Sequence, residues 1–289
     1  MKGVGKIISV LCFLYLPAIA MAQGNEYKLD EVYKIKDNGK IELYTDDADI
    51  QITGTDRSDV RVKVYYRLDT RGFAFGNKEF ELDISESGGD LIIRENSYGS
   101  TGVFFGTVTE QYEITIYAPK GVSLVLKGDD DDYRIRGIDG SIAINSDDAD
   151  IVITECNGNH FEFDIDDGDL EMDGGSGFLY VRSDDGDLIF RNSKFSEVSA
   201  ILDDADMLLE TSLTDGGDYT FKVDDGDLDM RILDGGGEFD ITFDDGRIIA
   251  TDEFKIVERD EHAQLLRLSD GNARIRMHAN DGRVSLSRL

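Results

Sequence analysis

The stretch FEFDIDDGDLEM, from Phe161 to Met172, contains the unit from which most of this chain is built. At its centre are two acidic residues, a small residue, a further acidic residue and an apolar one, Asp166-Asp167-Gly168-Asp169-Leu170. A period near 20 residues indicates stacked supersecondary units, and the chain has such a period. Six phrases of this kind start 19, 18, 19, 21 and 20 residues apart, at Asp147, Asp166, Asp184, Asp203, Asp224 and Asp244.

Apolar residues alternate with polar ones on both sides of each phrase. In the second unit the acidic phrase is preceded by Phe161, Phe163 and Ile165. Its apolar end is Leu170, and the next apolar residue, Met172, follows two positions later. Strict alternation is typical of a strand that buries one face. Each unit is therefore predicted to be a strand, an acidic corner and a second strand, and a Gly-rich corner leads to the next unit.

The fold class that these units predict is all-β. We favour a single-stranded β-solenoid with about 18–21 residues per coil, because the apolar columns recur in register through corners of unequal length. The alternative is an antiparallel meander in which each acidic phrase is a hairpin loop. Weaker copies of the phrase begin at Asp46, Asp129 and Asn280, whereas the register is blurred between Thr251 and Ala273.

The sequence divides into three segments. Residues 1–22 have a basic start, an apolar run from Ile7 to Ala20 and an A-x-A cleavage site, which together predict a secretory signal peptide. Residues 23–127 are a less regular, strand-rich opening of the same body, and residues 128–289 are the acidic solenoid repeats. We expect export to the periplasm, the cell surface or the extracellular space, with no transmembrane segment. Cys156, the cysteine outside the predicted signal peptide, is interpreted as a small apolar residue near a strand end.

The negative charge is concentrated in the repeats. From Gly128 to Ala250 the chain has 35 acidic and 8 basic residues, a net charge of −27, whereas the whole chain carries −31. A field of this sign repels nucleic acid and attracts cations and basic surfaces. The expected partners are therefore cations, a basic protein surface or a glycan, and nucleic acid is not expected.

The chain resembles the bacterial putative-adhesin domain family. The resemblance rests on the step Gly168-Asp169-Leu170 and its copies, on the strand and Pro-Lys-Gly lead-in from Tyr112 to Gly121, and on the early copy from Asp46 to Ile52. It covers most of residues 38 to 250 and implies an exported β-solenoid, but no activity and no site residues. This chain departs from the family pattern by having Asp-Asp where Ser and Thr are common.

The acidic corners have three interpretations. The first is structural, because Asp and Gly both suit tight corners. The second is a Ca²⁺ ladder, because Ca²⁺ takes six to eight oxygen ligands and stacked carboxylates could supply them. The third is catalysis by paired carboxylates. No EF-hand or calcium β-roll motif is present, so we expect no required cofactor and at most weak Ca²⁺ uptake. The candidate ligands are Asp147, Asp148, Asp166, Asp167, Asp184, Asp185, Asp203, Asp204, Asp224, Asp225, Asp244 and Asp245.

Two Gly-flanked aromatic patches precede the repeats. They contain Phe73 and Phe75 in the first patch and Phe104 and Phe105 in the second. We favour the interpretation that they cap the end of the solenoid, where open strands would invite aggregation. The functional alternative is a pair of partner-binding loops.

The function predicted from these features is that of an exported, non-enzymatic binding or scaffold protein, adhesin-like, which acts through its acidic face. The alternative is a carbohydrate-active β-helix enzyme that uses paired Asp residues from adjacent coils. A cleft flanked by stacked aromatic rings would favour the enzyme, and a smooth acidic ridge would favour the binding protein.

Overall fold

A computed structural model describes residues 26–74, 78–99 and 104–289 of the chain. Within these residues every regular element is a β-strand, and no helix is present. The all-β prediction is therefore confirmed. The predicted signal peptide and Phe75 lie outside the described residues.

The repeats form parallel pairs. Each strand before an acidic corner pairs with the equivalent strand of the next unit, as Phe161 of β12 does with Ile142 of β10, and strands after a corner pair in the same way. The meander alternative is therefore wrong for this block, because it requires antiparallel partners. The strands of the block are β8 (Ser123–Asp130), β9 (Asp132–Arg136), β10 (Ile142–Asp148), β11 (Ile151–Cys156), β12 (His160–Asp167), β13 (Leu170–Gly174), β14 (Ser176–Ser183), β15 (Asp187–Leu202), β16 (Asp206–Ser212), β17 (Asp218–Val223) and β18 (Asp227–Asp234).

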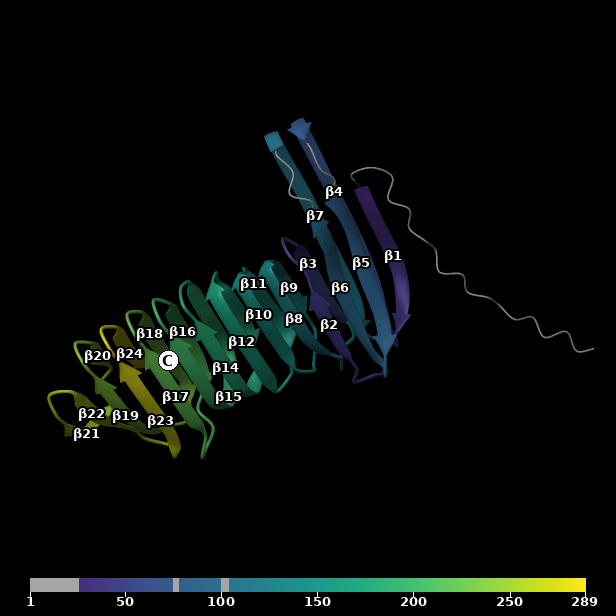
Figure 1. Ribbon diagram of the computed structural model, residues 1–289. Coiled ribbons are helices and arrows are strands. Elements are labelled where there is room, and N and C mark those ends of the chain that lie inside the picture. Colours follow the sequence, from purple (N-terminus) through teal and green to yellow (C-terminus); the bar gives the residue numbers. More distant parts are fainter. Residues whose placement is uncertain (1–25, 75–77, 100–103) are drawn as a thin grey trace, which may run out of the picture.

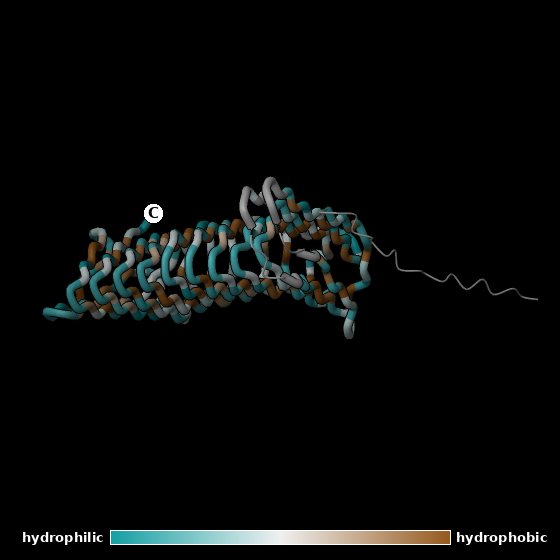
Figure 2. The backbone as a smooth tube through the Cα atoms, turned by 45° about the horizontal axis from the view of Figure 1, so that its top comes forward, coloured by the Kyte–Doolittle hydropathy of each residue, from teal (hydrophilic) through white to brown (hydrophobic). Residues whose placement is uncertain are grey.

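The two strands of each unit lie on opposite faces of an elongated body (Figure 1). We call the face of β8, β10, β12, β14 and β17 face B, and that of β9, β11, β13, β16 and β18 face A. The long strand β15 begins on face A and ends on face B. The predicted apolar columns fill the space between the faces, and Phe161, Phe163, Ile165, Leu170 and Met172 are all 0% exposed. Figure 2 shows the alternation of apolar strands and polar corners along the body.

At most of the acidic corners the third residue is small because the neighbouring corner passes close to it. Gly168 has φ +115°, and a Cβ at that position would collide with the backbone of Ala149 in the preceding coil. Gly186 stands in the same relation to Gly168. The small residue in the phrase is therefore a packing requirement of stacked corners.

The N-terminal strands extend both faces. They are β1 (Glu26–Lys34), β2 (Lys40–Tyr44), β3 (Asp49–Thr55), β4 (Asp59–Ala74), β5 (Lys78–Ser87), β6 (Asp90–Gly99) and β7 (Phe104–Pro119). The early phrase at Asp46 joins β2 to β3 as a further coil, which lies between β6 and β8 on face B and between β7 and β9 on face A. β4 and β7 form a long antiparallel ribbon that runs out beyond the coils in Figure 1.

Aromatic rings fill the space between the faces at this end. Phe80 stacks on Tyr66 with ring centroids 4.0 Å apart and meets Tyr27 and Tyr112 edge-on at 5.2 and 4.9 Å. These contacts close the N-terminal end of the core, a role that the sequence analysis assigned to other aromatic residues.

The C-terminal strands do not follow sequence order. They are β19 (Gly237–Phe243), β20 (Arg247–Ala250), β21 (Lys255–Arg259), β22 (Ala263–Leu268), β23 (Ala273–Ala279) and β24 (Arg283–Arg288). The last coil, β23 and β24, is inserted between β17–β18 and β19–β20. β21 and β22 are antiparallel, which explains the blurred register between Thr251 and Ala273.

Several charged and polar pairs join the inserted coil to β17 and β18. Asn280 of the last coil donates to Asp224 at 2.5 Å, Arg276 pairs with Asp218 at 2.6 Å, and Arg283 pairs with Asp227. If β19–β20 lay directly beside β17–β18, Asp244 would stack against Asp224 instead. The insertion of a coil with Asn and Arg at these positions removes that repulsion.

We predict that Asn280→Asp destabilises the fold by about 1 kcal/mol at low salt, because the new carboxylate would lie between Asp224 and Asp244. Urea unfolding measures the effect. Asn280→Ala is the control, since it removes the same hydrogen bond without adding charge. The excess cost of Asn280→Asp over Asn280→Ala should shrink at high salt; an equal cost for both variants would contradict the electrostatic account.

Candidate functional site

The predicted Ca²⁺ ligands all lie along one edge of the coil stack, where face B turns into face A. We call this line of first and second corner acids, from Asp147 to Asp245, the acidic ridge. Eleven of its twelve predicted residues are exposed and Asp184 is half-buried. Five corners are stacked in sequence order, but Asn280 and Asp281 separate Asp224 from Asp244. The ladder of six consecutive acidic corners that the sequence suggested is therefore interrupted before its last member.

Backbone hydrogen bonds hold the corners of the acidic ridge together. The amide of Asp204 donates to the carbonyl of Asp184 at 2.7 Å, and the amide of Asp225 donates to the carbonyl of Asp203 at 2.9 Å. The corners thus stack through their backbones, and their first two carboxylates are left on the outside.

The third acid of several phrases has a separate structural role. Asp169 accepts from the amide of Asp187 in the next coil at 2.9 Å, and Asp206 accepts from Asp227 at 2.8 Å. These carboxylates satisfy backbone donors between coils, which the sequence analysis did not recognise. The recurrence of Asp at the fourth position of the phrase was the available signal.

The stacked carboxylates repel one another in the middle of the acidic ridge. Partial desolvation, and then the neighbouring charges of Asp224, Asp204 and Asp184, raise the pKa of Asp203 above its usual range. Basic partners are few: Arg182 pairs with Asp184 at 3.2 Å and with Asp164 at 3.8 Å. A bound cation would relieve this repulsion.

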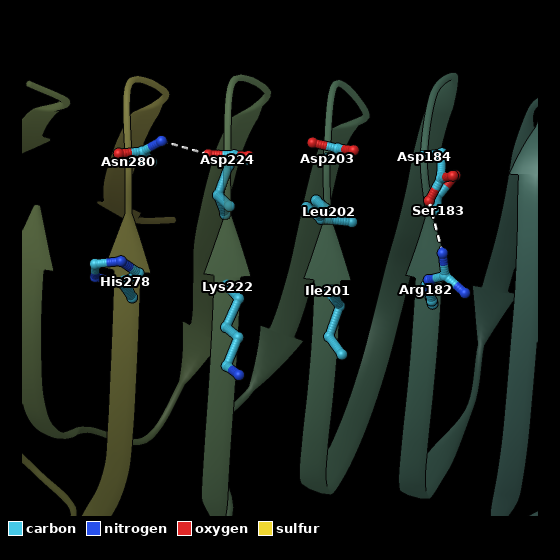
Figure 3. A pocket seen from close by; sticks show the side chains of 11 residues that line it. Arg182, Ser183, Asp184, Ile201, Leu202, Asp203, Lys222, Asp224, His278 and Asn280 are labelled. Atoms are coloured by element: carbon cyan, nitrogen blue, oxygen red, sulfur yellow. Dashed lines mark hydrogen bonds and ion pairs between the residues drawn. The ribbon is translucent and has the colours of Figure 1, made fainter. Parts of the chain in front are cut away.

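Within the described residues, no group of three or more His, Cys, Asp or Glu side chains is arranged to hold a metal ion. The acidic ridge presents its carboxylates in a row, one coil after another, as Asp184, Asp203 and Asp224 show in Figure 3. Such a row suits a partner with several positive charges along its length.

A shallow groove of about 470 Å³ runs along the face B side of the acidic ridge (Figure 3). Its lining combines polar side chains and charges of both signs with the apolar residues Ile201, Leu202 and Val223. The described residues that line it include no Phe, Tyr or Trp. They are Arg182, Ser183, Asp184, Ile201, Leu202, Asp203, Lys222, Val223, Asp224, His278 and Asn280.

One acid of the repeats is buried. Asp131 occupies the small-residue position of the phrase that begins at Asp129, is 0% exposed and points into the body. Its carboxylate accepts from the Thr45 hydroxyl at 2.7 Å, the Ala48 amide at 2.7 Å and the Tyr133 hydroxyl at 3.0 Å. Burial outweighs these bonds and raises the pKa of Asp131 to about 6. Asp131 thus joins the β2–β3 corner to the β8–β9 corner.

The other predicted residues are placed as follows. Phe73 of β4 pairs with Phe105 of β7 along the backbone, and Ala74 pairs with Phe104, so the two segments are neighbouring strands of the projecting ribbon. Cys156 is buried at the end of β11, and burial raises the pKa of its thiol. No helix of the described residues is long and apolar enough to cross a membrane.

A family model described as Toastrack DUF4097 matches residues 38–287 of the chain. The search of curated proteins found no match. Among solved structures, a putative adhesin from Parabacteroides distasonis is 9% identical, with a TM-score of 0.45 and coverage of 91% of this chain and 97% of that chain. A putative adhesin from Bacteroides fragilis is 12% identical, with a TM-score of 0.39 and coverage of 90% and 96%. At these values the solved structures support no statement about function.

We predict that Asp131→Asn removes one component of the pH dependence of stability. The folded-state pKa of Asp131 is about 6, above the ordinary value of 3.8. Its contribution to stability is therefore full below the ordinary value and lost as the pH rises through about 6. The Asn side chain can still accept from the Ala48 amide, and the two hydroxyls can rotate to accept from its NH₂ group.

Urea unfolding at several pH values tests this prediction. From about pH 4 to pH 7, the stability of the variant relative to the wild type should rise by about 2–3 kcal/mol. A constant difference over this range would show that Asp131 keeps an ordinary pKa in the folded protein.

Proposed function

We propose that this chain, which belongs to the Toastrack DUF4097 family, is an exported β-solenoid that works as a non-enzymatic, adhesin-like binding or scaffold protein. Its binding surface is the acidic ridge, and its partner is a basic surface that presents several cationic groups along a line. The place of action is the periplasm, the cell surface or the extracellular space.

The single observation that supports this proposal most is the stacking of exposed corner acids on successive coils. The ridge is held rigid from beneath by backbone hydrogen bonds between corners. It therefore presents a fixed row of negative charge, which costs little conformational entropy when a partner binds. Rigid charge rows of this kind increase the rate and the specificity of association with partners of opposite sign.

The carbohydrate-enzyme alternative has less support. Paired carboxylates act as acid and base when they flank a substrate cleft and one of them is kept protonated. The groove beside the ridge is shallow and its described lining has no stacked aromatic rings. By the criterion set out from the sequence, these features favour a binding surface.

We predict that the mature protein binds an oligolysine peptide and that the affinity falls steeply with added salt. A ridge variant with Asp203, Asp204, Asp224 and Asp225 all changed to Asn should bind about tenfold more weakly, because each exposed charge contributes a few tenths of a kcal/mol. Fluorescence anisotropy measures both effects.

The control changes four exposed Asp residues that lie off the ridge. Asp215→Asn, Asp234→Asn, Asp240→Asn and Asp252→Asn remove the same total charge. This variant should retain most of the affinity. If both variants lose affinity equally, only the net charge of the protein matters, and the acidic ridge is not the binding surface.

A second prediction concerns Ca²⁺. Because the ridge carboxylates lie in a row, millimolar Ca²⁺ and Mg²⁺ should raise the unfolding temperature by similar, small amounts at fixed ionic strength, as expected for screening. Thermal unfolding against an EDTA control measures this. A rise of many degrees with Ca²⁺ and little with Mg²⁺ would instead identify a specific metal site, since a ligand that binds only the folded state stabilises it by mass action.

A further inference from the structure

A continuous row of outward-facing side chains runs parallel to the acidic ridge on face B. Each member lies two positions before the first residue of the corner of its coil, and the parallel register places each member beside the next. The row consists of Tyr44, Lys127, Asn145, Asp164, Arg182, Ile201, Lys222 and His278.

The surface is hollowed between this row and the acidic ridge at two places. One hollow is the groove of about 470 Å³ around Ile201 and Asp203. The other, of about 310 Å³, lies further toward the N-terminal end and includes Tyr44, Lys127 and Asp129. Both lie beside residues two positions before a corner.

The two sides of the larger groove differ in chemistry. On the ridge side, Asp203 and Asp224 offer carboxylate oxygens that accept hydrogen bonds and attract cations. On the other side, Arg182 and Lys222 offer cationic donors (Figure 3). Within the described residues, the ammonium group of Lys222 makes no hydrogen bond or ion pair, so it is available to a ligand.

Apolar surface lies among these polar groups. The Ile201 side chain, 37% exposed, separates Arg182 from Lys222 in the larger groove. In the smaller hollow, the guanidinium of Arg94 lies 4.6 Å from the ring centroid of half-buried Tyr44 and covers that face of the ring. A sugar ring has apolar C–H faces and a rim of hydroxyls, and therefore matches a surface on which a few apolar patches lie between hydrogen-bonding groups.

The charge of the ridge selects the kind of sugar. Carboxylates on neighbouring coils crowd one another around Asp203 and favour a ligand that brings positive charge. Coils repeat at the strand spacing of about 4.8 Å, which is comparable to the length of one sugar unit in a linear polymer. Successive sugars of a β-1,4-linked polymer face alternate ways, so a polymer with one amine per sugar would present an amine to the ridge at about every second coil.

We propose that this flank of the acidic ridge binds a linear glycan with free amino groups, a hexosamine polymer that lies along the coil stack. This inference rests on the proposed function and names the partner class. The protonated amines lie on the ridge carboxylates, and the hydroxyl and ring oxygens accept from Lys222 and Arg182. A polyanionic glycan would be repelled by the ridge, and a simple polycation would gain nothing from Lys222.

The probe is the linear hexamer of β-1,4-linked glucosamine, with the fully N-acetylated hexamer as the matched control. Binding is measured by calorimetry at mildly acidic pH and low salt, where the amines are protonated. The glucosamine hexamer should bind, and the acetylated hexamer should bind at least about tenfold more weakly, since acetylation removes the charge and keeps the backbone.

The decisive variant is Lys222→Ala. If the groove holds the sugar as proposed, loss of this donor weakens glucosamine hexamer binding several-fold, although it makes the surface more negative. For oligolysine, the same change should leave binding unchanged or strengthen it, because only the charge matters. Asp203→Asn should weaken binding of the glucosamine hexamer more than the control Asp215→Asn does. The control removes one charge at a different corner of the coil.

Two outcomes would overturn the inference. One is stronger binding of the glucosamine hexamer by Lys222→Ala than by the wild type, which would show that only the net charge of the surface affects binding. The other is equal binding, or no binding, of the two hexamers. In either case oligolysine binding to the ridge decides the proposed function separately, so the two failures can be told apart. The unfolding temperature of each variant confirms that it is folded.

Discussion

The stacking of acidic corners at the spacing of β-strands is the constraint on which the rest of this structure depends. Carboxylates about 5 Å apart repel, yet the apolar columns on both faces can be buried only if the corners stack in register. The chain meets both demands by joining the corners through their backbones, with a small residue where they approach most closely, as at Gly168 and Gly186. The third Asp of the phrase adds a hydrogen bond between coils.

The same constraint explains the order of the coils at both ends. At the C-terminal end, the last coil is inserted where Asn280 and Arg283 meet Asp224 and Asp227, so the first position of the acidic corners is interrupted by a neutral residue. At the N-terminal end, the β2–β3 coil is joined to its neighbour by Asp131, whose carboxylate is buried among three donors. Polar and charged contacts thus join neighbouring coils at both ends, while apolar burial provides most of the stability.

The acids that stabilise the stack and the acids that face solvent are different residues of one phrase. The third Asp is used between coils, and the first two are left outside on a rigid edge, beside a groove with cationic and apolar members. A surface of this kind favours recognition of an extended, positively charged partner. Membership of the Toastrack DUF4097 family fits this view but does not by itself specify a partner.

The sequence by itself determined the all-β class, the coil period, the buried columns and the position of the acidic corners, because a period-two pattern and a repeated corner are local properties. It also located the weaker copies at Asp46, Asp129 and Asn280, which all form corners between paired strands. Only the tertiary structure decided the order of the coils, the burial of Asp131 and the groove beside the acidic ridge. These depend on which strands become neighbours, and contacts between residues 56 or 86 positions apart leave no periodic signal in the chain.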